Sequence, residues 1–215
     1  MEDPGSAYLR PVSRPFRAFL ALFLTTALTH GVLARSNDRF DVGVDNFGQI
    51  NKNYYRGAQP DAAGFRALKQ LGIKTVIDLQ KDGKKQEAGW VRDAGMQYVN
   101  IPLSSTKPAT ASQTEYFLKL VNDPANWPVY VHCAGGRHRT GEMTAIYRIT
   151  HDTWSADRAF AEMKDYDYYA FGGHGSLRDY VYSYYDDYGR GALLAKAQTA
   201  PAASTATGAV EAVKQ

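Results

Sequence analysis

Residues 129–141 read VYVHCAGGRHRTG, and this stretch decides how the chain on either side of it is organised. Its apolar, β-branched opening predicts a short buried strand over residues 129–132. Gly135 and Gly136 then predict a tight turn, and residues 141–150 predict a helix. Open α/β sheets bind their ligands where a strand ends in such a turn, so we expect the functional site here.

The turn combines three features that suit the chemistry of phosphate. Its glycines allow successive backbone N–H groups to point inward, and the helix that follows places the positive end of its dipole behind them. Cys133, the only cysteine of the chain, stands at the start of the turn, where the same field favours the reactive thiolate. Arg139 follows after five intervening residues and offers a planar fork to two phosphate oxygens. We infer a site at which a thiolate attacks phosphorus.

Outside this stretch, short apolar runs alternate with helical patterns. Asp61 can cap a helix that Gly72 ends, and Ser155 can cap another helix. Strands are predicted over residues 49–55, 74–79, 98–103 and 129–132, and helices over residues 61–71, 86–94, 112–121, 141–150, 155–164 and 176–188. This alternation predicts an α/β fold in which helices flank a central, mostly parallel sheet.

Both ends of the chain differ in composition from the body between them. Residues 1–34 carry three arginines before an apolar run and end in small residues, which predicts a secretory signal peptide or a membrane anchor. A buried N-terminal helix is the alternative. Residues 191–215 are rich in Ala and Thr and contain no aromatic residue, so we expect a disordered tail. The catalytic domain is then residues 38–190, exported to the periplasm or the cell exterior, or anchored outside the cytoplasm.

The composition narrows the range of functions. A chain of 215 residues with 44% hydrophobic and 22% charged residues is ordinary for one globular domain with appendages. One cysteine excludes an intrachain disulfide and a Cys₄ or Cys₂His₂ zinc site, and five histidines spread along the chain predict no metal cluster. The net charge of +3 gives no reason to expect a polybasic nucleic-acid binder.

The stretch VHCAGGRHRTG resembles the active-site loop of the cysteine-based protein tyrosine and dual-specificity phosphatases, whose pattern is His-Cys, five residues, Arg, then Thr or Ser. The matching positions are His132, Cys133, Gly136, Arg139 and Thr140. Upstream, NFGQINKNYYRGAQP and LKQLGIKTVIDL resemble the opening of the atypical dual-specificity phosphatases, including the branch shared by plants, fungi and bacteria. The similarity covers roughly residues 44–165. It implies a phosphotyrosine-phosphatase-like fold in a bacterial member of this superfamily.

The resemblance implies a role for each matching residue. Cys133 would be the nucleophile that forms a phosphocysteine, and Arg139 would bind the phosphoryl oxygens and stabilise the transition state. Thr140 would donate a hydrogen bond to the thiolate, and His132 would orient the loop through hydrogen bonds. The phosphate would be held by Ala134, Gly135, Gly136, Arg137, His138 and Arg139. No metal or other cofactor is implied, because the arginine and the backbone amides neutralise the phosphate charge.

The substrate stays open at this level. The side chains of Arg137 and His138 would add positive potential beside the loop, although they could also be merely exposed. GGRHRTG resembles the loop of inositol-pyrophosphate phosphatases, so inositol phosphates are candidates beside phosphotyrosine, phosphoserine and phosphothreonine proteins. We expect a monomeric phosphatase of phosphomonoesters. The alternatives are a phosphate-recognising binding module with weak turnover and a rhodanese-like sulfurtransferase, against which Thr140 and the five-residue spacing argue.

One part of the family pattern is missing from this chain. These phosphatases usually carry an aspartate as general acid on the loop that here spans residues 102–111, and this loop contains no Asp or Glu. Asp82, just after the preceding predicted strand, is the favoured substitute. The other candidates are Asp78, Glu115 and His138, whereas Asp123 is expected to serve a turn at a helix end.

Tyrosines gather near the end of the predicted body, where eight of the 15 fall between Tyr166 and Tyr188. The stripe that includes Val181, Tyr184 and Tyr188 predicts a core helix with half-buried tyrosines. The alternative is an aromatic wall that stacks beside the substrate. The Gly-rich stretch before His174 predicts a flexible loop that could reach the site, with His174 itself exposed to solvent.

Overall fold

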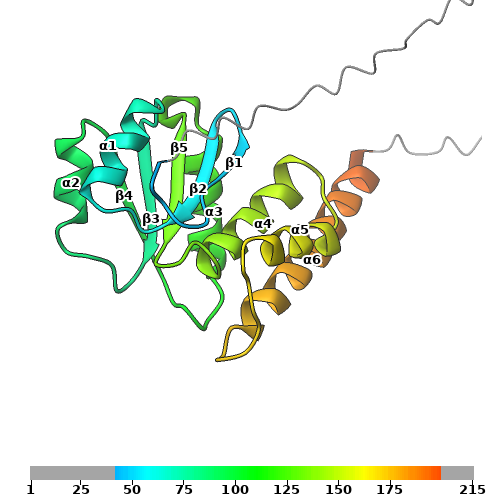
Figure 1. The fold of residues 1–215 in the computed structure, drawn as a ribbon. Helices are drawn as coiled ribbons and strands as arrows, with labels where there is room; N and C mark the ends of the chain where they lie inside the picture. The colour runs from blue at the N-terminus through cyan, green and yellow to red at the C-terminus, as the bar shows by residue number, and fades with distance from the viewer. Residues whose placement is uncertain (1–41, 200–215) are drawn as a thin grey trace, which may run out of the picture. The chain divides into compact units, whose positions relative to one another are not determined.

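The computed structural model describes residues 42–199, and the side chains of residues 42–191 (Figure 1). Its strands are β1 (Gly48–Asn51), β2 (Tyr54–Ala58), β3 (Thr75–Gln80), β4 (Gln97–Leu103) and β5 (Val129–Cys133). Its helices are α1 (Ala62–Gln70), α2 (Glu87–Asp93), α3 (Ala111–Asn122), the short 3₁₀ helix η1 (Pro124–Asn126), α4 (Arg139–His151), α5 (Ala156–Asp165) and α6 (Gly175–Thr199). The predicted alternation of strands and helices is therefore confirmed over most of the chain that the structure describes.

The strands form one sheet in the order β1-β2-β5-β3-β4. β1 runs antiparallel to β2, whereas β2, β5, β3 and β4 run parallel to one another. The prediction of a central, mostly parallel sheet is confirmed. The single strand predicted over residues 49–55 is wrong, because the chain turns at residues 52–53 and forms a hairpin. Asn51 Oδ1 fixes this turn by accepting the Asn53 N–H at 2.8 Å.

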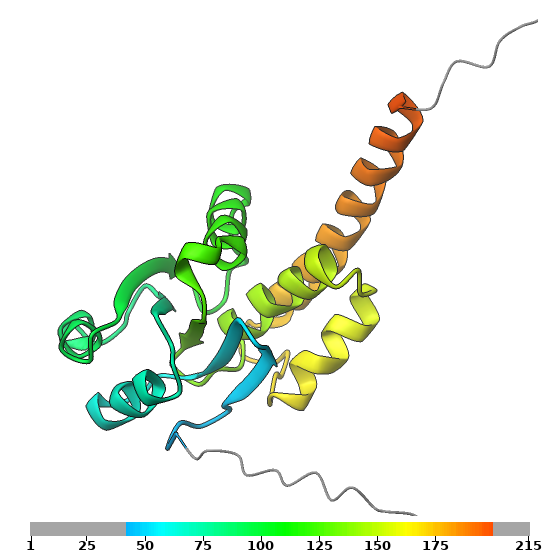
Figure 2. The ribbon, with the colours of Figure 1, turned by 90° about the horizontal axis from the view of Figure 1, so that it is seen from above.

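Helices cover both faces of the sheet, and each face has its own apolar core (Figure 2). Side chains alternate between the two faces along every strand. Val131 and Cys133 of β5 belong to the core that contains Phe117 of α3 and residues of α4. Tyr130 of β5 belongs to the core on the α1 and α2 side, and the ring of His132 stacks on it at 5.6 Å. Cys133 and His132 therefore point to opposite faces.

Side-chain caps begin the helices close to where the sequence predicts them. Asp61 Oδ1 accepts a backbone N–H at 2.8 Å at the start of α1, and Ser155 Oγ accepts one at 3.3 Å at the start of α5. Both predicted caps are confirmed. Thr110 and Gln113 form a reciprocal capping box, which starts α3 one residue earlier than predicted.

The carboxyl ends of the parallel strands share one edge of the sheet, and this edge positions the site (Figure 1). The loops that leave it are residues 81–86 after β3, residues 104–110 after β4 and residues 134–138 after β5. The connection between α5 and α6, residues 166–174, joins them, because His174 Nδ1 lies 2.7 Å from the carbonyl oxygen of Ser105. Four segments that are distant in sequence thus meet around the end of β5.

Helix α6 is longer than predicted. It continues to Thr199, so the disordered tail predicted over residues 191–215 is wrong for residues 191–199. The run ALLAKAQ at residues 192–198 consists of strong helix formers, which explains the extension. Residues 200–215 and the predicted signal or anchor at residues 1–34 lie outside the described residues, and both assignments stay predictions. Among the described helices, none has both the length and the apolarity that crossing a membrane requires.

Candidate active site

The centre of the site is the loop of residues 134–138, which we call the 134–138 loop. Cys133 is the last residue of β5, one position later than the predicted strand end, and only 3% of its surface is exposed. Arg139 is the first residue of α4, two positions earlier than the predicted helix start. The strand, the loop and the helix N-terminus thus follow one another as the sequence predicts, with the cysteine at the junction.

In the described part of the chain, the carbonyl oxygens of the 134–138 loop are hydrogen-bonded to other segments, whereas its N–H groups are not. Its carbonyl oxygens are bound by the segment that leads into and through β2: the Ala134 oxygen accepts the Gln59 N–H at 3.2 Å, and the Gly135 oxygen accepts Asn46 Nδ2 at 2.9 Å. The Gly136 oxygen accepts the guanidinium of Arg56. Within residues 42–199, the N–H groups of the 134–138 loop donate to no acceptor. Bound carbonyls and free N–H groups at a helix N-terminus are the electrostatics of an anion-binding nest.

Gly136 makes this loop geometry feasible. Its φ of +65° lies in the left-handed region, which costs an L-residue free energy. A Cβ at this position would lie 2.6 Å from the carbonyl carbon of Gly57 and 2.8 Å from the Ala58 nitrogen, both backbone atoms of β2. The loop therefore approaches the neighbouring strand more closely than any side chain allows.

We expect Gly136→Ala to lower the free energy of unfolding by more than about 2 kcal/mol, because the added methyl group meets backbone that cannot swing aside. Gly135→Ala is the matched control, since a Cβ there meets only the flexible side chain of Arg137, at 3.7 Å. Urea unfolding of both variants measures the difference. Equal stabilities of the two variants would contradict the close approach of loop and strand.

The fold brings Asp82, the favoured candidate for the general acid, into contact with Arg139. Arg139 Nη1 donates to Asp82 Oδ1 at 2.8 Å and lies 3.4 Å from the Leu103 carbonyl oxygen. The Arg139 side chain is 6% exposed, whereas that of Asp82 is 74% exposed. The hydrogen bond from Arg139, helped by its charge, lowers the pKa of Asp82, which is therefore a carboxylate at neutral pH.

The other acid candidates lie elsewhere. Asp78 faces the α1 and α2 side of the sheet, where it accepts the Tyr98 hydroxyl at 2.8 Å and where burial raises its pKa. Glu115 is exposed on α3 and lines a groove of about 450 Å³ between α3 and α6, and no residue of the 134–138 loop lines this groove. Asp123 accepts the Ala125 N–H at 2.9 Å in η1, which confirms its predicted role in a helix-end turn.

His138 behaves differently from its predicted roles. Its ring stacks on that of His174 with a centroid distance of 3.7 Å and meets Tyr169 edge-on at 4.4 Å. Burial, together with the neighbouring His174, lowers the pKa of His138 to about 4. The imidazole is consequently neutral at neutral pH, so the positive potential that the sequence predicts for it is absent, and it holds no acidic proton for catalysis in that range.

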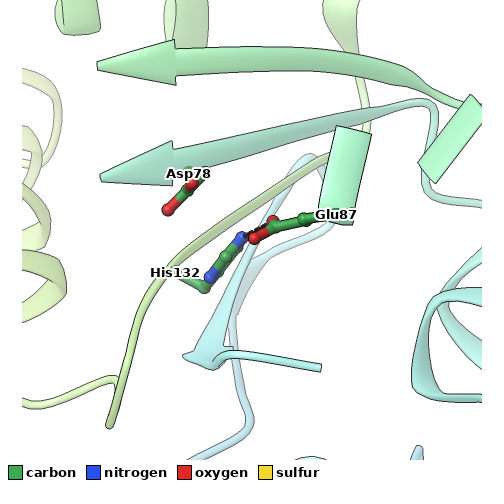
Figure 3. Close-up of side chains that lie close together, drawn as sticks. All are labelled: Asp78, Glu87 and His132. Atoms are coloured by element: carbon green, nitrogen blue, oxygen red, sulfur yellow. Dashed lines mark ion pairs between the residues drawn. The ribbon is translucent and has the colours of Figure 1, made fainter. Parts of the chain in front are cut away.

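Among the described residues, His132 makes no hydrogen bond to the 134–138 loop, so its orienting role stays a prediction. Figure 3 shows its ring directed at Glu87 of α2, with Asp78 of β3 nearby and all three side chains buried. His132 Nε2 lies 2.7 Å from Glu87 Oε1, although neither ring nitrogen makes a well-aligned hydrogen bond within the described residues. The three potential ligand atoms lie within 4.8 Å of one another. Asp78 is already engaged by Tyr98 and other donors, so we assign the trio to joining β3, α2 and β5.

Thr140 also departs from its implied role. Its Oγ1 is buried in the first turn of α4 and has no hydrogen-bond partner among the described residues, so its implied bond to the Cys133 thiolate is not formed here.

Three residues near the loop were not predicted from the sequence: Asn46, Arg56 and Glu142. Asn46 and Arg56 hold loop carbonyls, and both lie in the stretch whose resemblance to phosphatases is noted above. An arginine inside an otherwise apolar strand was the available signal, because arginine is almost never fully buried without a partner. Glu142 of α4 is completely buried and accepts the Ala109 N–H at 2.9 Å, which ties the end of the 104–110 segment to α4. Burial raises the pKa of Glu142 to about 8.

The family follows from a comparison of the whole sequence. A family model described as "DSP-PTPase phosphatase fused to NAD+ Kinase" matches residues 41–176, which is more than half of the chain. The chain belongs to this family. The description of this family as a DSP-PTPase phosphatase confirms the family resemblance seen in the sequence.

Two proteins named as phosphatases are similar to this chain in sequence and in fold. The dual specificity protein phosphatase TpbA of Pseudomonas aeruginosa is 29% identical over 134 residues, which cover 62% of this chain and 59% of TpbA. A structure of TpbA in complex with pTyr has a TM-score of 0.50 and 25% identity, covering 66% of this chain and 92% of that one. The catalytic core of the PP-IP phosphatase SIW14 from S. cerevisiae has a TM-score of 0.58 at 23% identity, covering 72% of this chain and 94% of that one. The chain thus spans about three fifths of the length of TpbA, and the predicted phosphotyrosine-phosphatase-like fold is confirmed.

Proposed function

We propose that the protein is a cysteine-dependent phosphatase that hydrolyses phosphomonoesters through a phosphocysteine. One observation carries this proposal: Cys133 opens onto five consecutive N–H groups that have no acceptor within residues 42–199, at the N-terminus of α4. Arg139 adds a guanidinium to the same place. Phosphate is the anion that such a nest and fork suit, and a cysteine beside it is the nucleophile that such a site needs.

In the first step the Cys133 thiolate attacks phosphorus, so that a P–S bond forms as the bond to the leaving oxygen breaks. The leaving oxygen takes the electron pair of that bond and the proton of Asp82. In the second step water attacks phosphorus, its proton passes to the Asp82 carboxylate, and the P–S electron pair returns to sulfur. The loop N–H groups and Arg139 stabilise the equatorial charge in both steps.

The contact with Arg139 explains how Asp82 can be ionised in the free enzyme and protonated once substrate is bound. Substrate phosphate and Asp82 compete for the same guanidinium, since Arg139 Nη1 lies 2.8 Å from Asp82 Oδ1. A phosphate that takes Arg139 leaves Asp82 without its cation and beside a dianion. Both changes raise the pKa of a carboxyl group, so Asp82 binds a proton where the leaving group needs one.

The relatives suggest two classes of substrate. TpbA has been solved with pTyr, and SIW14 is named a PP-IP phosphatase. Phosphorylated proteins and inositol phosphates are therefore both proposed classes at this stage, because the loop contacts described above recognise only the phosphoryl group common to them.

Rapid acid quench of the full chain during turnover tests this function. With p-nitrophenyl phosphate, whose leaving group needs little protonation, we expect the wild type to release phosphate. In Asp82→Asn we expect phosphocysteine to accumulate at Cys133, because the second step lacks its base.

The pH dependence with an alkyl phosphate tests the role of Asp82 as general acid. The kcat/KM of the wild type should fall as pH rises above the lowered pKa of Asp82, and this dependence should vanish in Asp82→Asn. On the alkyl phosphate, Asp82→Asn should lower kcat/KM about 10²- to 10⁴-fold relative to the wild type.

The outcomes separate the function from the role of one residue. Absence of both phosphate release and phosphocysteine in the wild type would contradict the phosphatase function. Turnover with an unchanged pH profile in Asp82→Asn would instead remove Asp82 from the mechanism and leave the function standing.

A further inference from the structure

The connection between α5 and α6 places two aromatic rings beside the 134–138 loop. Tyr169 meets the ring of His138, a loop residue, at a centroid distance of 4.4 Å. Phe171 stacks on Tyr169 at 4.2 Å and 17°. We call Tyr169 and Phe171 the aromatic rim. Because His138 belongs to the loop itself, the rim extends outward from the phosphate-binding groups one ring at a time.

The rim is held in place by polar contacts on both sides. His138 Nε2 lies 3.2 Å from the Tyr169 carbonyl oxygen, and His174 Nδ1 lies 2.7 Å from that of Ser105. A carbonyl oxygen can only accept, so the imidazoles donate. The Ser176 hydroxyl donates to the Thr106 carbonyl at 2.8 Å. Figure 1 shows the α5–α6 connection beside the loop that follows β4, at the edge from which the site opens.

Phe171 is unusual in its exposure. At 74% it is more exposed than the tyrosines that are also prominent on the described surface, which range from 39% to 47%. Tyr169 covers one face of its ring, and the other face is open. A phenylalanine held in this position, followed by two glycines with positive φ, presents an apolar surface to a ligand and does little for the core.

The charges around the loop are distributed unevenly. On the rim side His138 is neutral, and Arg137 lies 3.8 Å from the carboxylate of Asp167. The segment that carries Asp82, which accepts from Arg139, holds the exposed Lys81, Lys84 and Lys85. A polyanion with charge all round would find three of these lysines on the segment that carries Asp82 and a fourth, Lys107, on the segment after β4 that His174 contacts. A peptide with an apolar side chain could use both the rim and these lysines.

We propose that the aromatic rim binds an aromatic or aliphatic side chain next to the phosphorylated residue of a protein, which makes phosphoproteins the substrate class of this site. The proposal rests on the phosphatase function above and specifies it. Phe171 supplies the stacking surface, Tyr169 supports Phe171, and the lysine-bearing segment accommodates acidic neighbours. Inositol phosphates, which carry no apolar side chain, gain nothing from the rim.

The test uses the full chain and two phosphotyrosyl peptides that differ only in carrying Phe or Ala at the positions flanking phosphotyrosine. We expect the wild type to prefer the Phe peptide about three- to tenfold in kcat/KM, the range that one aromatic pair contributes. Phe171→Ala should lose this preference and turn over both peptides at the rate that the wild type shows on the Ala peptide. Tyr188→Ala is the matched control, because Tyr188 is an exposed aromatic residue, 44% exposed, on α6.

Each outcome decides the proposal. Equal rates on the two peptides in the wild type, or a preference that survives in Phe171→Ala, would overturn it. An equal loss of turnover by Phe171→Ala on an inositol pyrophosphate would also overturn it, since the rim would then not select peptides. In all these cases continued turnover of p-nitrophenyl phosphate would leave the phosphatase function intact, whereas absence of turnover on every substrate would remove the function and the rim together.

Discussion

Cys133→Ser removes turnover: we expect phosphate release from p-nitrophenyl phosphate to fall by at least about 10⁴-fold. A serine hydroxyl group is not ionised near neutral pH, so the variant has no anionic nucleophile to attack phosphorus. His132 of the same strand points to the opposite face of the sheet, towards Glu87. The loss therefore comes from the nucleophile alone, because serine has nearly the same shape and Cys133 is 3% exposed.

Thermal unfolding and binding of inorganic phosphate test whether the loss of turnover comes from misfolding or from a disturbed loop. The variant should keep its thermal transition and should still bind inorganic phosphate, because the loop N–H groups and Arg139 are unchanged. Residual activity above about one hundredth of the wild type would show that another group attacks phosphorus. Lost phosphate binding would show that the substitution had disturbed the loop, and Cys133→Ala would then be needed to separate the two effects.

The parts of the site that could be predicted from the sequence are those that local chain geometry determines. Cys133 and Arg139 are joined by one turn, so their spacing already predicts their meeting. Asp82 was within reach of the same reasoning, because the carboxyl ends of neighbouring parallel strands share one edge, and β3 does neighbour β5. The caps at Asp61 and Ser155 follow from the same local logic.

The rest depends on contacts between segments that are distant in sequence. The pKa of His138 is lowered in part by His174, which stacks on it across 36 positions of chain, and no local pattern encodes that contact. The hairpin at residues 52–53 turns on Lys and Asn without a glycine, so it carries no strong turn signal. Arg56 was missed because its partner is a backbone carbonyl at position 136, which sequence patterns do not identify.

Arg56 leads to the second large effect, because it is a buried charge that forms no ion pair with a carboxylate in the described part of the chain. It is 0% exposed in β2, and its guanidinium lies 3.8 Å above the ring of Tyr166 and donates to the Gly136 oxygen. Its Nε and Nη1 atoms have no hydrogen-bond partner within the described residues. Burial lowers the pKa of Arg56, whereas Tyr54, Tyr166, Glu162 and, to the smallest extent, Cys133 favour its charged form. Arginine nevertheless stays charged in proteins.

The register of the sheet places this charge behind the nucleophile. Arg56 pairs with Val131, and Ala58, two residues later, pairs with Cys133. Residues two apart in a strand share a face, so the Arg56 side chain lies on the face to which Cys133 points. A cation in a dry interior interacts strongly with an anion nearby, and the anions of this site are the thiolate and the substrate phosphate. The free energy that burying Arg56 costs is thus offset when the site carries its negative charge.

This reasoning predicts opposite signs for activity and stability in Arg56→Met. Methionine is apolar and adaptable in shape, so replacing an unpaired buried charge should leave the free energy of unfolding unchanged or raise it. The same substitution should lower kcat/KM about 10²-fold, which is the effect of removing one fixed electrostatic contact to a transition state. Alkylation of Cys133 by iodoacetamide at pH 7 should slow in parallel, because less of the cysteine is thiolate.

The matched control is Arg158→Met, which removes an arginine that lies 3.8 Å above the ring of Trp154 but is exposed on α5. It should change neither kcat/KM nor the alkylation rate. Arg56→Lys keeps the charge but loses the hydrogen bond from Nη2 to the Gly136 oxygen, so its activity should lie between those of the wild type and Arg56→Met. If Arg56→Met lost stability and activity together while alkylation of Cys133 stayed fast, Arg56 would be a support for the loop backbone only. Slower alkylation together with undiminished stability is the result expected if the buried charge acts on the thiolate.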